Sequence, residues 1–152
     1  MTRTQLILLA AAGSAAMLMG AWTFQAFGFA PCKMCIWQRW PHGAAVVIGA
    51  LALVLPWLIL PLLGALAAAT TGAIAIYHSG VERDWWEGPT TCTSGDIGGL
   101  SPDDLFNQIM SAPLVRCDEI AWQMLGVTMP NLNALFSFAF VAIWLLAAMR
   151  RA

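Results

Sequence analysis

The sequence predicts an all-α membrane protein, a four-transmembrane-helix bundle with two loops on one side of the membrane. Apolar residues make up 60% of the 152 residues and charged residues 10%, whereas about 25% of the residues of a soluble domain are charged. All eight acidic residues lie between positions 82 and 119, and long stretches on either side carry no formal charge. Because the length suits one compact unit, we expect a single membrane domain.

Two apolar runs near the ends of the chain predict one crossing each. Residues 4–32 carry no formal charge, and a helix needs about 20 mainly apolar residues to cross a bilayer, so the first span is predicted at about 6–29. Small residues at 14–16 resemble a signal-peptide cleavage site. The apolar run continues well past them, so we expect the span to be retained. The last span is predicted at about 132–149.

The uncharged run 40–81 is too long for one helix and is expected to form two. Pro56 and Pro61 lie near its middle, and a proline there ends or kinks a helix. We therefore predict a tight hairpin of two spans, at about 43–57 and 62–78.

The charges at the termini predict which side of the membrane each loop faces. Arg3, Arg150 and Arg151 have no acid near them in the sequence, and the positive-inside rule then places both termini in the cytoplasm. A short loop at about 30–42 and a long loop at about 79–131 fall on the outer side, the periplasm for a bacterial inner membrane. Two cations in the short loop oppose this orientation, whereas the acids of the long loop agree with it.

The short loop carries Cys32 and Cys35 in a Cys-X-X-Cys motif. The oxidising side of a membrane is where disulfides form and persist, and one thiol of such a motif often has a lowered pKa that makes it reactive. Lys33 and Arg39 supply positive charge that stabilises a thiolate. A helix that begins near Cys35 would place Arg39 on the same face. We expect this site at the membrane surface, within reach of a lipid-soluble acceptor.

The long loop carries Cys92 and Cys117, which are separated by 25 residues. We expect a bridge between them to be exposed, and exposed bridges are the labile or catalytic ones. Between them, Ser101 and Pro102 followed by two acids predict the start of a short helix. Its apolar stripe predicts an amphipathic helix on the membrane surface.

Three interpretations of the cysteines remain open at this level, with a redox relay favoured over two structural disulfides. A metal site is disfavoured, because the second pair is widely spaced and no histidine lies near it in sequence. There is no basic cluster to indicate nucleic acid. A transporter is not supported, because the predicted spans hold no acidic or basic residue.

The segment Pro31-Cys32-Lys33-Met34-Cys35-Ile36-Trp37-Gln38-Arg39 resembles the first external loop of the disulfide bond formation protein B (DsbB) family. In that family a Pro-Cys-X-X-Cys-Ile-aromatic-X-Arg segment opens the second transmembrane helix. Similar segments are Gly88 to Cys92, Cys117-Asp118-Glu119 with Trp122, and Leu125 to Pro130. The resemblance covers nearly the whole chain in order, with two cysteines in each of two external loops.

The resemblance implies a thiol:quinone oxidoreductase that re-oxidises a periplasmic thioredoxin-fold thiol oxidase (DsbA-like). Cys92 would form a mixed disulfide with that partner, and Cys117 would then exchange with Cys32. Cys35 would lie beside a membrane quinone, ubiquinone or menaquinone, and Arg39 would stabilise the developing negative charge.

Two positions leave the family role open. Some members carry an acid where this chain has Gln38, which puts a proton-donor role there in doubt. His78 is a candidate for quinone binding or proton transfer, although an interfacial histidine is more often a hydrogen-bonding anchor. The alternatives to this function are a vitamin K epoxide reductase-like quinone/thiol oxidoreductase and a membrane scaffold with two structural disulfides.

Overall fold

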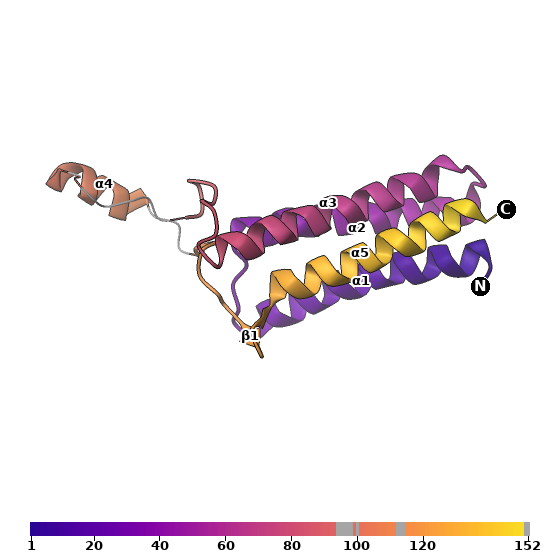
Figure 1. Ribbon diagram of the computed structural model, residues 1–152, viewed down its shortest axis with the longest axis horizontal. Helices are drawn as coiled ribbons and strands as arrows, with labels where there is room; N and C mark the ends of the chain where they lie inside the picture. The colour runs from indigo at the N-terminus through magenta and orange to yellow at the C-terminus, as the bar shows by residue number, and fades with distance from the viewer. Residues whose placement is uncertain (94–98, 100, 112–114, 151–152) are drawn as a thin grey trace.

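The computed structural model describes residues 1–93, 99, 101–111 and 115–150, and within them four long helices lie side by side in one bundle. The helices are α1 (Arg3–Ala26), α2 (Lys33–Val54), α3 (Ile59–Val81) and α5 (Met129–Met149). Both termini and the α2–α3 turn lie at one end of the bundle, called here the terminal end (Figure 1). The remaining connections, with all four cysteines, lie at the opposite end, called the cysteine end. Arg151 and Asp96 fall outside the described residues.

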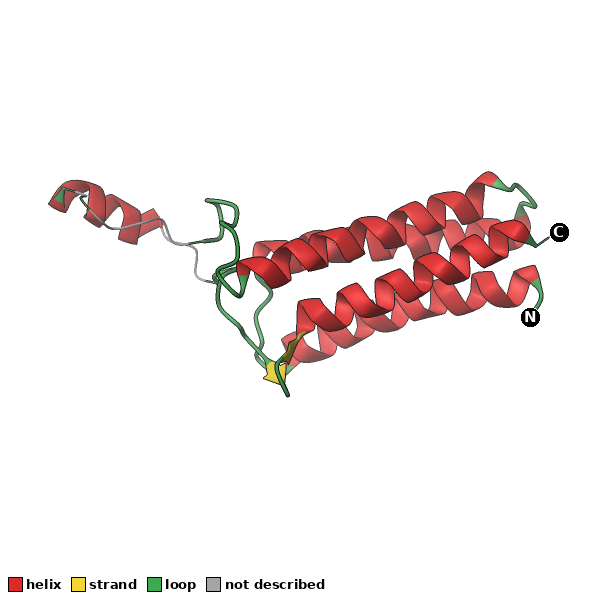
Figure 2. Cartoon of the chain, viewed as in Figure 1, coloured by secondary structure: helices red, strands yellow, loops and turns green. Residues whose placement is uncertain are grey.

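The cysteine end carries two small elements besides the loops (Figure 2). Strands β1 (Gln123–Met124) and β2 (Val127–Thr128) pair antiparallel directly before α5. The short helix α4 (Pro102–Ser111) extends away from the bundle. Its predicted start is confirmed, because the Ser101 Oγ accepts the Asp104 N–H at 3.2 Å. Its position on a membrane surface stays a prediction.

Helix α2 begins at Lys33, well before the predicted span at Gly43 and close to the helix start near Cys35 that was considered for the Cys-X-X-Cys motif. Most of the segment predicted as the short loop is therefore helical, because Cys32 caps the helix by accepting the Cys35 N–H at its Sγ, at 3.2 Å. Pro41 lies inside this helix without ending it. The prediction relied on apolar composition, which does not detect helical turns that are polar.

The other boundaries have local causes. Helix α1 begins at Arg3 behind a capping box of Thr2 and Gln5. It ends at Ala26, three residues before the predicted limit, where Gly28 adopts a φ of 97° that glycine tolerates. Pro61, expected in the turn, lies in the first turn of α3, where its missing N–H would have had no helical partner.

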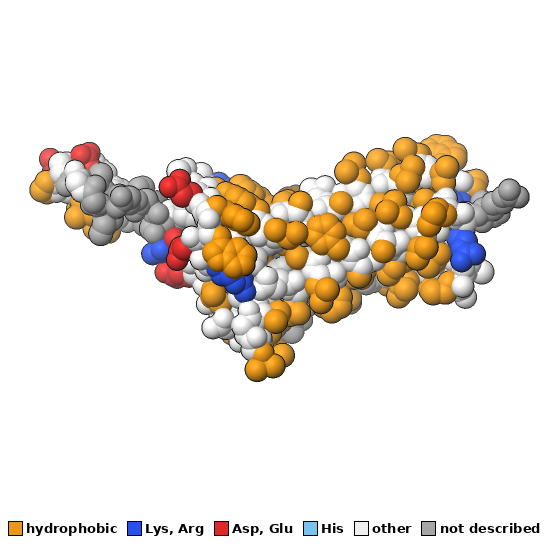
Figure 3. Space-filling model, viewed as in Figure 1, with side chains coloured by type: hydrophobic (Ala, Val, Ile, Leu, Met, Phe, Trp, Pro, Cys, Tyr) orange, Lys and Arg blue, Asp and Glu red, His pale blue; other side chains and the backbone are white. Residues whose placement is uncertain are grey.

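Among the described residues, three helices are long and apolar enough to cross a membrane, namely α1, α3 and α5. Helix α2 falls short of that measure, because its first half carries polar and charged side chains. Large apolar side chains cover the outside of the bundle along its length (Figure 3). This surface, together with the three apolar helices, identifies a membrane protein.

The core at the terminal end is apolar and closely packed. Trp144 of α5 is fully buried there, among small residues of the neighbouring helices. A Cβ atom added to Gly64 of α3 would lie 2.6 Å from the Trp144 ring, and one added to Gly13 of α1 would overlap the Phe140 ring. Glycine at these positions therefore lets the helices approach closely, as is common in membrane bundles.

Candidate functional site

The structure brings the two cysteine pairs together in one buried cluster at the cysteine end. Cys92 and Cys117 form a disulfide, whereas Cys32 and Cys35 are free of any disulfide. Cys32, Cys92 and Cys117 pack with Met34 and Val81, and Cys35 packs against that cluster. Segments far apart in the sequence thus meet at the start of α2.

The prediction that the Cys92–Cys117 bridge is exposed is wrong. Cys92 is 1% exposed and Cys117 is fully buried. The Cys117 N–H donates to the Cys92 carbonyl at 2.6 Å, and both cysteines pack with Val81 in one buried cluster. Arg116 is held beside the bridge by a bidentate ion pair with Asp118, which raises the pKa of its guanidinium. The bridge is therefore shielded from solvent in this structure.

The free pair shares one hydrogen bond, from the Cys32 Sγ to the Cys35 Sγ at 2.9 Å. That bond, together with burial, raises the pKa of the Cys32 thiol above its usual range. Cys32 therefore keeps its proton and donates, while Cys35 is the acceptor. A sulfur that accepts such a bond near a helix N-terminus is stabilised as a thiolate.

His78 of α3 joins the free pair, with its Nε2 3.5 Å from the Cys32 Sγ. On the other side of the ring, Nδ1 lies 2.9 Å from the Gln38 Nε2, which also donates to the Met34 carbonyl at 3.2 Å. The amide nitrogen bears hydrogens only, so Nδ1 must be the acceptor and Nε2 carries the ring proton. His78 thus presents an N–H to the Cys32 sulfur.

The same three residues could in principle hold a metal ion, since ligand atoms of Cys32, Cys35 and His78 lie within 4.8 Å of one another. The sequence did not indicate this, because the histidine is distant along the chain. In the tautomer inferred from the Gln38 contact, the Nε2 that would bind a metal carries the ring proton, so metal binding would displace that proton.

Glu82 is a site residue that the sequence reasoning missed. It caps the end of α3, is 9% exposed, and its Oε1 lies 4.0 Å from the His78 Nε2. Burial raises the pKa of this carboxyl to about 7, against the opposing effects of a Thr128 hydrogen bond and the Arg83 charge. Its spacing of four residues from His78, on one helix face, was the available signal.

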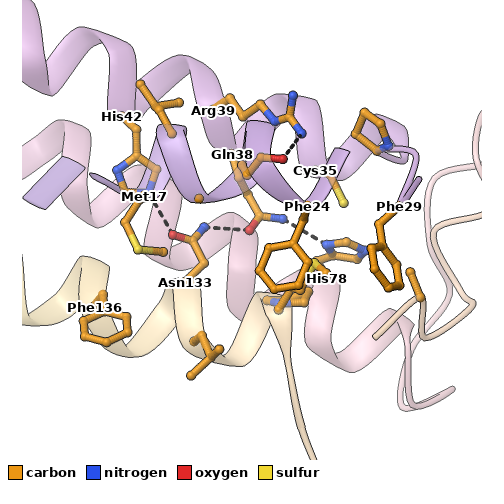
Figure 4. Close-up of a pocket in the computed structure, with 18 of the residues that line it drawn as sticks. Met17, Phe24, Phe29, Cys35, Gln38, Arg39, His42, His78, Asn133 and Phe136 are labelled. Carbon is orange, nitrogen blue, oxygen red and sulfur yellow. Dashed lines mark hydrogen bonds between the residues drawn. The ribbon is translucent and has the colours of Figure 1, made fainter. Parts of the chain in front are cut away.

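A cavity of about 250 Å³ opens between α1, α2 and α5 next to the free pair (Figure 4). Its walls are mainly apolar, with a few polar groups, as in most small-molecule sites. The polar lining residues are Cys35, Gln38, Arg39, His42, His78 and Asn133. The Arg39 side chain is fixed to α1, because its Nη1 donates to the Gln25 Oε1 at 2.9 Å.

A buried polar network crosses the wall of this cavity and was not predicted. Asn133 of α5 lies at its centre, with its Nδ2 2.6 Å from the Gln38 Oε1 and its Oδ1 2.8 Å from the His42 Nε2. Thr71 and Ser137 complete the network. It links the free cysteine pair, through His78 and Gln38, to His42 deeper in the bundle.

Comparison with known proteins gives a consistent result. The model of the family described as "Disulfide bond formation protein DsbB" matches residues 3–147. The chain is 29% identical over 136 residues to a protein named "Disulfide bond formation protein B" from Haemophilus ducreyi, covering 82% of this chain and 73% of that protein. It is also 29% identical over 118 residues to a protein of Rickettsia prowazekii named "Uncharacterized protein RP370". That match covers 73% of this chain and 67% of that protein. No solved structure matches the chain.

Proposed function

The chain belongs to the DsbB family of membrane disulfide bond formation proteins, and from that premise we propose that it is a quinone-dependent protein-disulfide oxidoreductase. It re-oxidises a DsbA-like dithiol protein in the periplasm and passes the electrons to a membrane quinone. The observation that carries the proposal is the shared cluster of both cysteine pairs, from which Cys35 reaches the cavity wall.

The outer step is a thiol–disulfide exchange at the Cys92–Cys117 bridge. A thiolate of the partner attacks the Cys92 sulfur, a mixed disulfide forms, and Cys117 leaves with the electron pair of the broken bond. The partner's second thiol then attacks its own bridged sulfur and releases Cys92. The partner is oxidised and the pair is reduced by two electrons.

The inner step moves these electrons to the first pair. The Cys117 thiolate attacks the Cys32–Cys35 disulfide at the Cys32 sulfur, and Cys35 leaves as a thiolate. Attack by Cys92 on the Cys32–Cys117 bond then restores the outer bridge. The arrangement in the structure, with the outer bridge formed and the inner pair free, matches the state that this step produces.

The cavity fits a quinone headgroup, because its walls are apolar and its polar groups lie near Cys35. When bound, a quinone supplies the two-electron acceptor, of the ubiquinone or menaquinone class, that the inner pair requires. Arg39 contributes a guanidinium charge suited to stabilising both the Cys35 thiolate and negative charge on a ligand oxygen. His78 donates to the Cys32 sulfur and holds the inner pair in place.

We also propose that α2 is the fourth transmembrane span, with both termini in the cytoplasm and the cysteine end in the periplasm. Gln38 and His42 lower the hydropathy of α2, yet they are only 6% and 3% exposed. Their polar groups face the bundle interior, so lipid does not meet them.

The test follows quinone absorbance when purified protein, a soluble quinone and a reduced DsbA-like protein are mixed without oxygen. We expect rapid loss of quinone with the natural chain and no loss above background with Cys35→Ser. Val54→Ala is the control, because Val54 is 79% exposed at the other end of the same helix. Folded natural protein that consumes no quinone with any tested partner would refute the proposal.

A further inference from the structure

The β1–β2 hairpin carries two large apolar side chains at its tip. Leu125 is 97% exposed and Met124 is 62% exposed. Met124 pairs with Val127 in the register of the two strands, so Leu125 and Gly126 form a two-residue turn. Apolar side chains gain free energy when they leave water, so a surface that covers this tip would stabilise it.

The backbone of the turn does not explain why leucine stands there. Leu125 has a φ of 52° and Gly126 a φ of 79°. A two-residue hairpin turn with positive φ at both positions favours Asn-Gly, and a bulky residue rarely adopts that conformation. Leu125 is therefore unfavourable for the turn itself, which points to a contact of its side chain outside the chain.

The base of the hairpin is held firmly against the bundle. Thr128 is fully buried. The Arg83 Nη2 donates to the Gly126 carbonyl at 3.0 Å, and the Trp122 ring lies 5.6 Å from the Phe24 ring of α1. These contacts use the backbone of the turn and the residue before β1, so they fix the direction of the tip while its side chains stay exposed.

The tip continues the lipid-facing surface of the bundle. Figure 1 shows the hairpin projecting sideways at the level where α1 ends, whereas α4 extends away from the bundle. Apolar side chains cover this projection (Figure 3). The last turns of α1 also expose Trp22 and Phe27, and aromatic residues gather where a membrane meets water. The tip therefore lies at the expected level of the membrane interface.

The charge pattern favours lipid over a soluble protein as the contact. All eight acidic residues lie between positions 82 and 119, and residues 120–149 carry no formal charge. The hairpin and the apolar helix α5 belong to this one uncharged stretch. A docking surface for a soluble protein has a polar rim around its apolar centre, whereas an uncharged apolar tip suits the boundary between lipid headgroups and acyl chains.

We propose that the β1–β2 hairpin is a membrane anchor, whose Met124 and Leu125 side chains insert into the lipid interface at the cysteine end. The anchor requires only that the bundle spans a membrane, and it is independent of the quinone reaction. Cys117 lies five residues before Trp122. The anchor thereby restrains the segment that carries this cysteine close to the membrane surface.

The test measures the depth of the tip in a bilayer by electron paramagnetic resonance. In the full-length chain, Cys32→Ser and Cys35→Ser remove both free thiols, and the other two cysteines are bonded to each other. Leu125→Cys then supplies the one free thiol for a nitroxide label. The protein is placed in phosphatidylcholine–phosphatidylglycerol vesicles, and collisions with oxygen and with a water-soluble nickel chelate give the depth. We expect the label about 5–10 Å below the lipid phosphates.

Two labelled positions calibrate the measurement. Glu119→Cys replaces an exposed acid six residues earlier in the chain, and its label should lie in water. Leu66→Cys replaces an exposed leucine of the apolar helix α3, and its label should lie in the hydrocarbon core.

Met124→Cys is a second reporter, which decides the matter even if Leu125→Cys does not fold. In that background Leu125→Asn keeps a residue that accepts positive φ and removes the apolar side chain, so the label should move toward water. Leu125→Met is the matched control, because it keeps an apolar side chain, and it should leave the depth unchanged.

Three outcomes would overturn the proposal. The first is a tip label in water while the Leu66 label lies in hydrocarbon. The second is a tip label that loses contact with the nickel chelate only when a reduced dithiol protein is added, which would make the tip a protein docking surface. The third is a Met124 label whose depth is the same with Leu125→Asn as with the natural leucine.

Discussion

The two ends of the bundle use the same four helices for different purposes. At the terminal end, Trp144 packs against glycine and alanine in an apolar core. At the cysteine end, Gln38, His42, His78 and Asn133 are buried in hydrogen-bonded contact with one another beside a cavity. The terminal end can obtain stability from packing alone. The cysteine end buries a connected polar network beside a cavity, and departures of this kind from apolar packing occur mainly at functional sites.

Among the tests of this comparison, Asn133→Leu is expected to have the largest effect on stability. The change leaves the Gln38 Oε1 and the His42 Nε2 without their partner inside the bundle. Each buried group left unpaired costs about 1–3 kcal/mol, so we expect the free energy of unfolding to fall by about 3–4 kcal/mol. Denaturant unfolding in detergent, followed by circular dichroism, measures it.

Ser137→Ala is the matched control, because it removes one donor to the same Asn133 oxygen and leaves His42 in place. It should cost about 1 kcal/mol. The double variant Asn133→Leu with His42→Phe removes both partners of one bond, and should be less destabilised than the sum of the single changes. Additive costs would show that the network carries no coupling.

The overall architecture could be predicted from sequence, but the polar network could not. Long uncharged runs indicated α1, α3 and α5, and a proline-containing segment indicated the turn between α2 and α3. The predicted span of α2 began too late, because polar and charged residues among positions 33–42 lower the hydropathy of this part of the helix. Gln38 and His42 face inward and Arg39 reaches α1, and hydropathy alone does not distinguish that arrangement from an exposed loop.

The site could be predicted in part for a similar reason. The cysteines, Arg39 and His78 carry recognisable chemistry, and the structure brings them to one end of the bundle. His42 and Asn133 are single polar residues on two different helices, 91 positions apart. Neither residue belongs to a periodic sequence pattern, so the contact between them is seen only in the packed bundle.

The second largest effect is a dependence of stability on pH, which is expected from the cysteine end and not from the terminal end. Burial raises the pKa of Glu82 from 4.5 to about 7, so the folded state disfavours the charged carboxylate. Below pH 4.5 the group is protonated in both states and has no effect. Between about pH 4.5 and 7 the unfolded state ionises first, so stability falls as pH rises, and above pH 7 the loss is complete.

Glu82→Gln keeps the shape of the protonated group and removes its titration. The variant should be more stable than the natural chain by about 2–3 kcal/mol at pH 8 and equally stable at pH 4. Unfolding curves at both values measure the difference. A constant gap at the two pH values would mean that Glu82 acts through packing and not through its charge.

The smallest effect is expected at the terminal end, and it would show that packing there is independent of the chemistry. Gly64→Ala adds a Cβ that meets the Trp144 ring at 2.6 Å, and overpacking of this kind costs about 1–2 kcal/mol. Gly43→Ala in α2 is the matched control, because its Cβ would meet no atom within 4 Å in the described part of the chain. That change should be neutral or stabilise the helix by up to about 1 kcal/mol.

The two glycine variants should both retain quinone reduction once they are folded, because neither residue lines the cavity. Thermal unfolding and the rate of quinone loss, measured on the same preparations, check the two halves of the prediction. If Gly64→Ala slowed the reaction at a temperature where the protein is fully folded, the ends would be mechanically coupled. The terminal core would then set the spacing of α2 and α5, on which the contact between His42 and Asn133 depends.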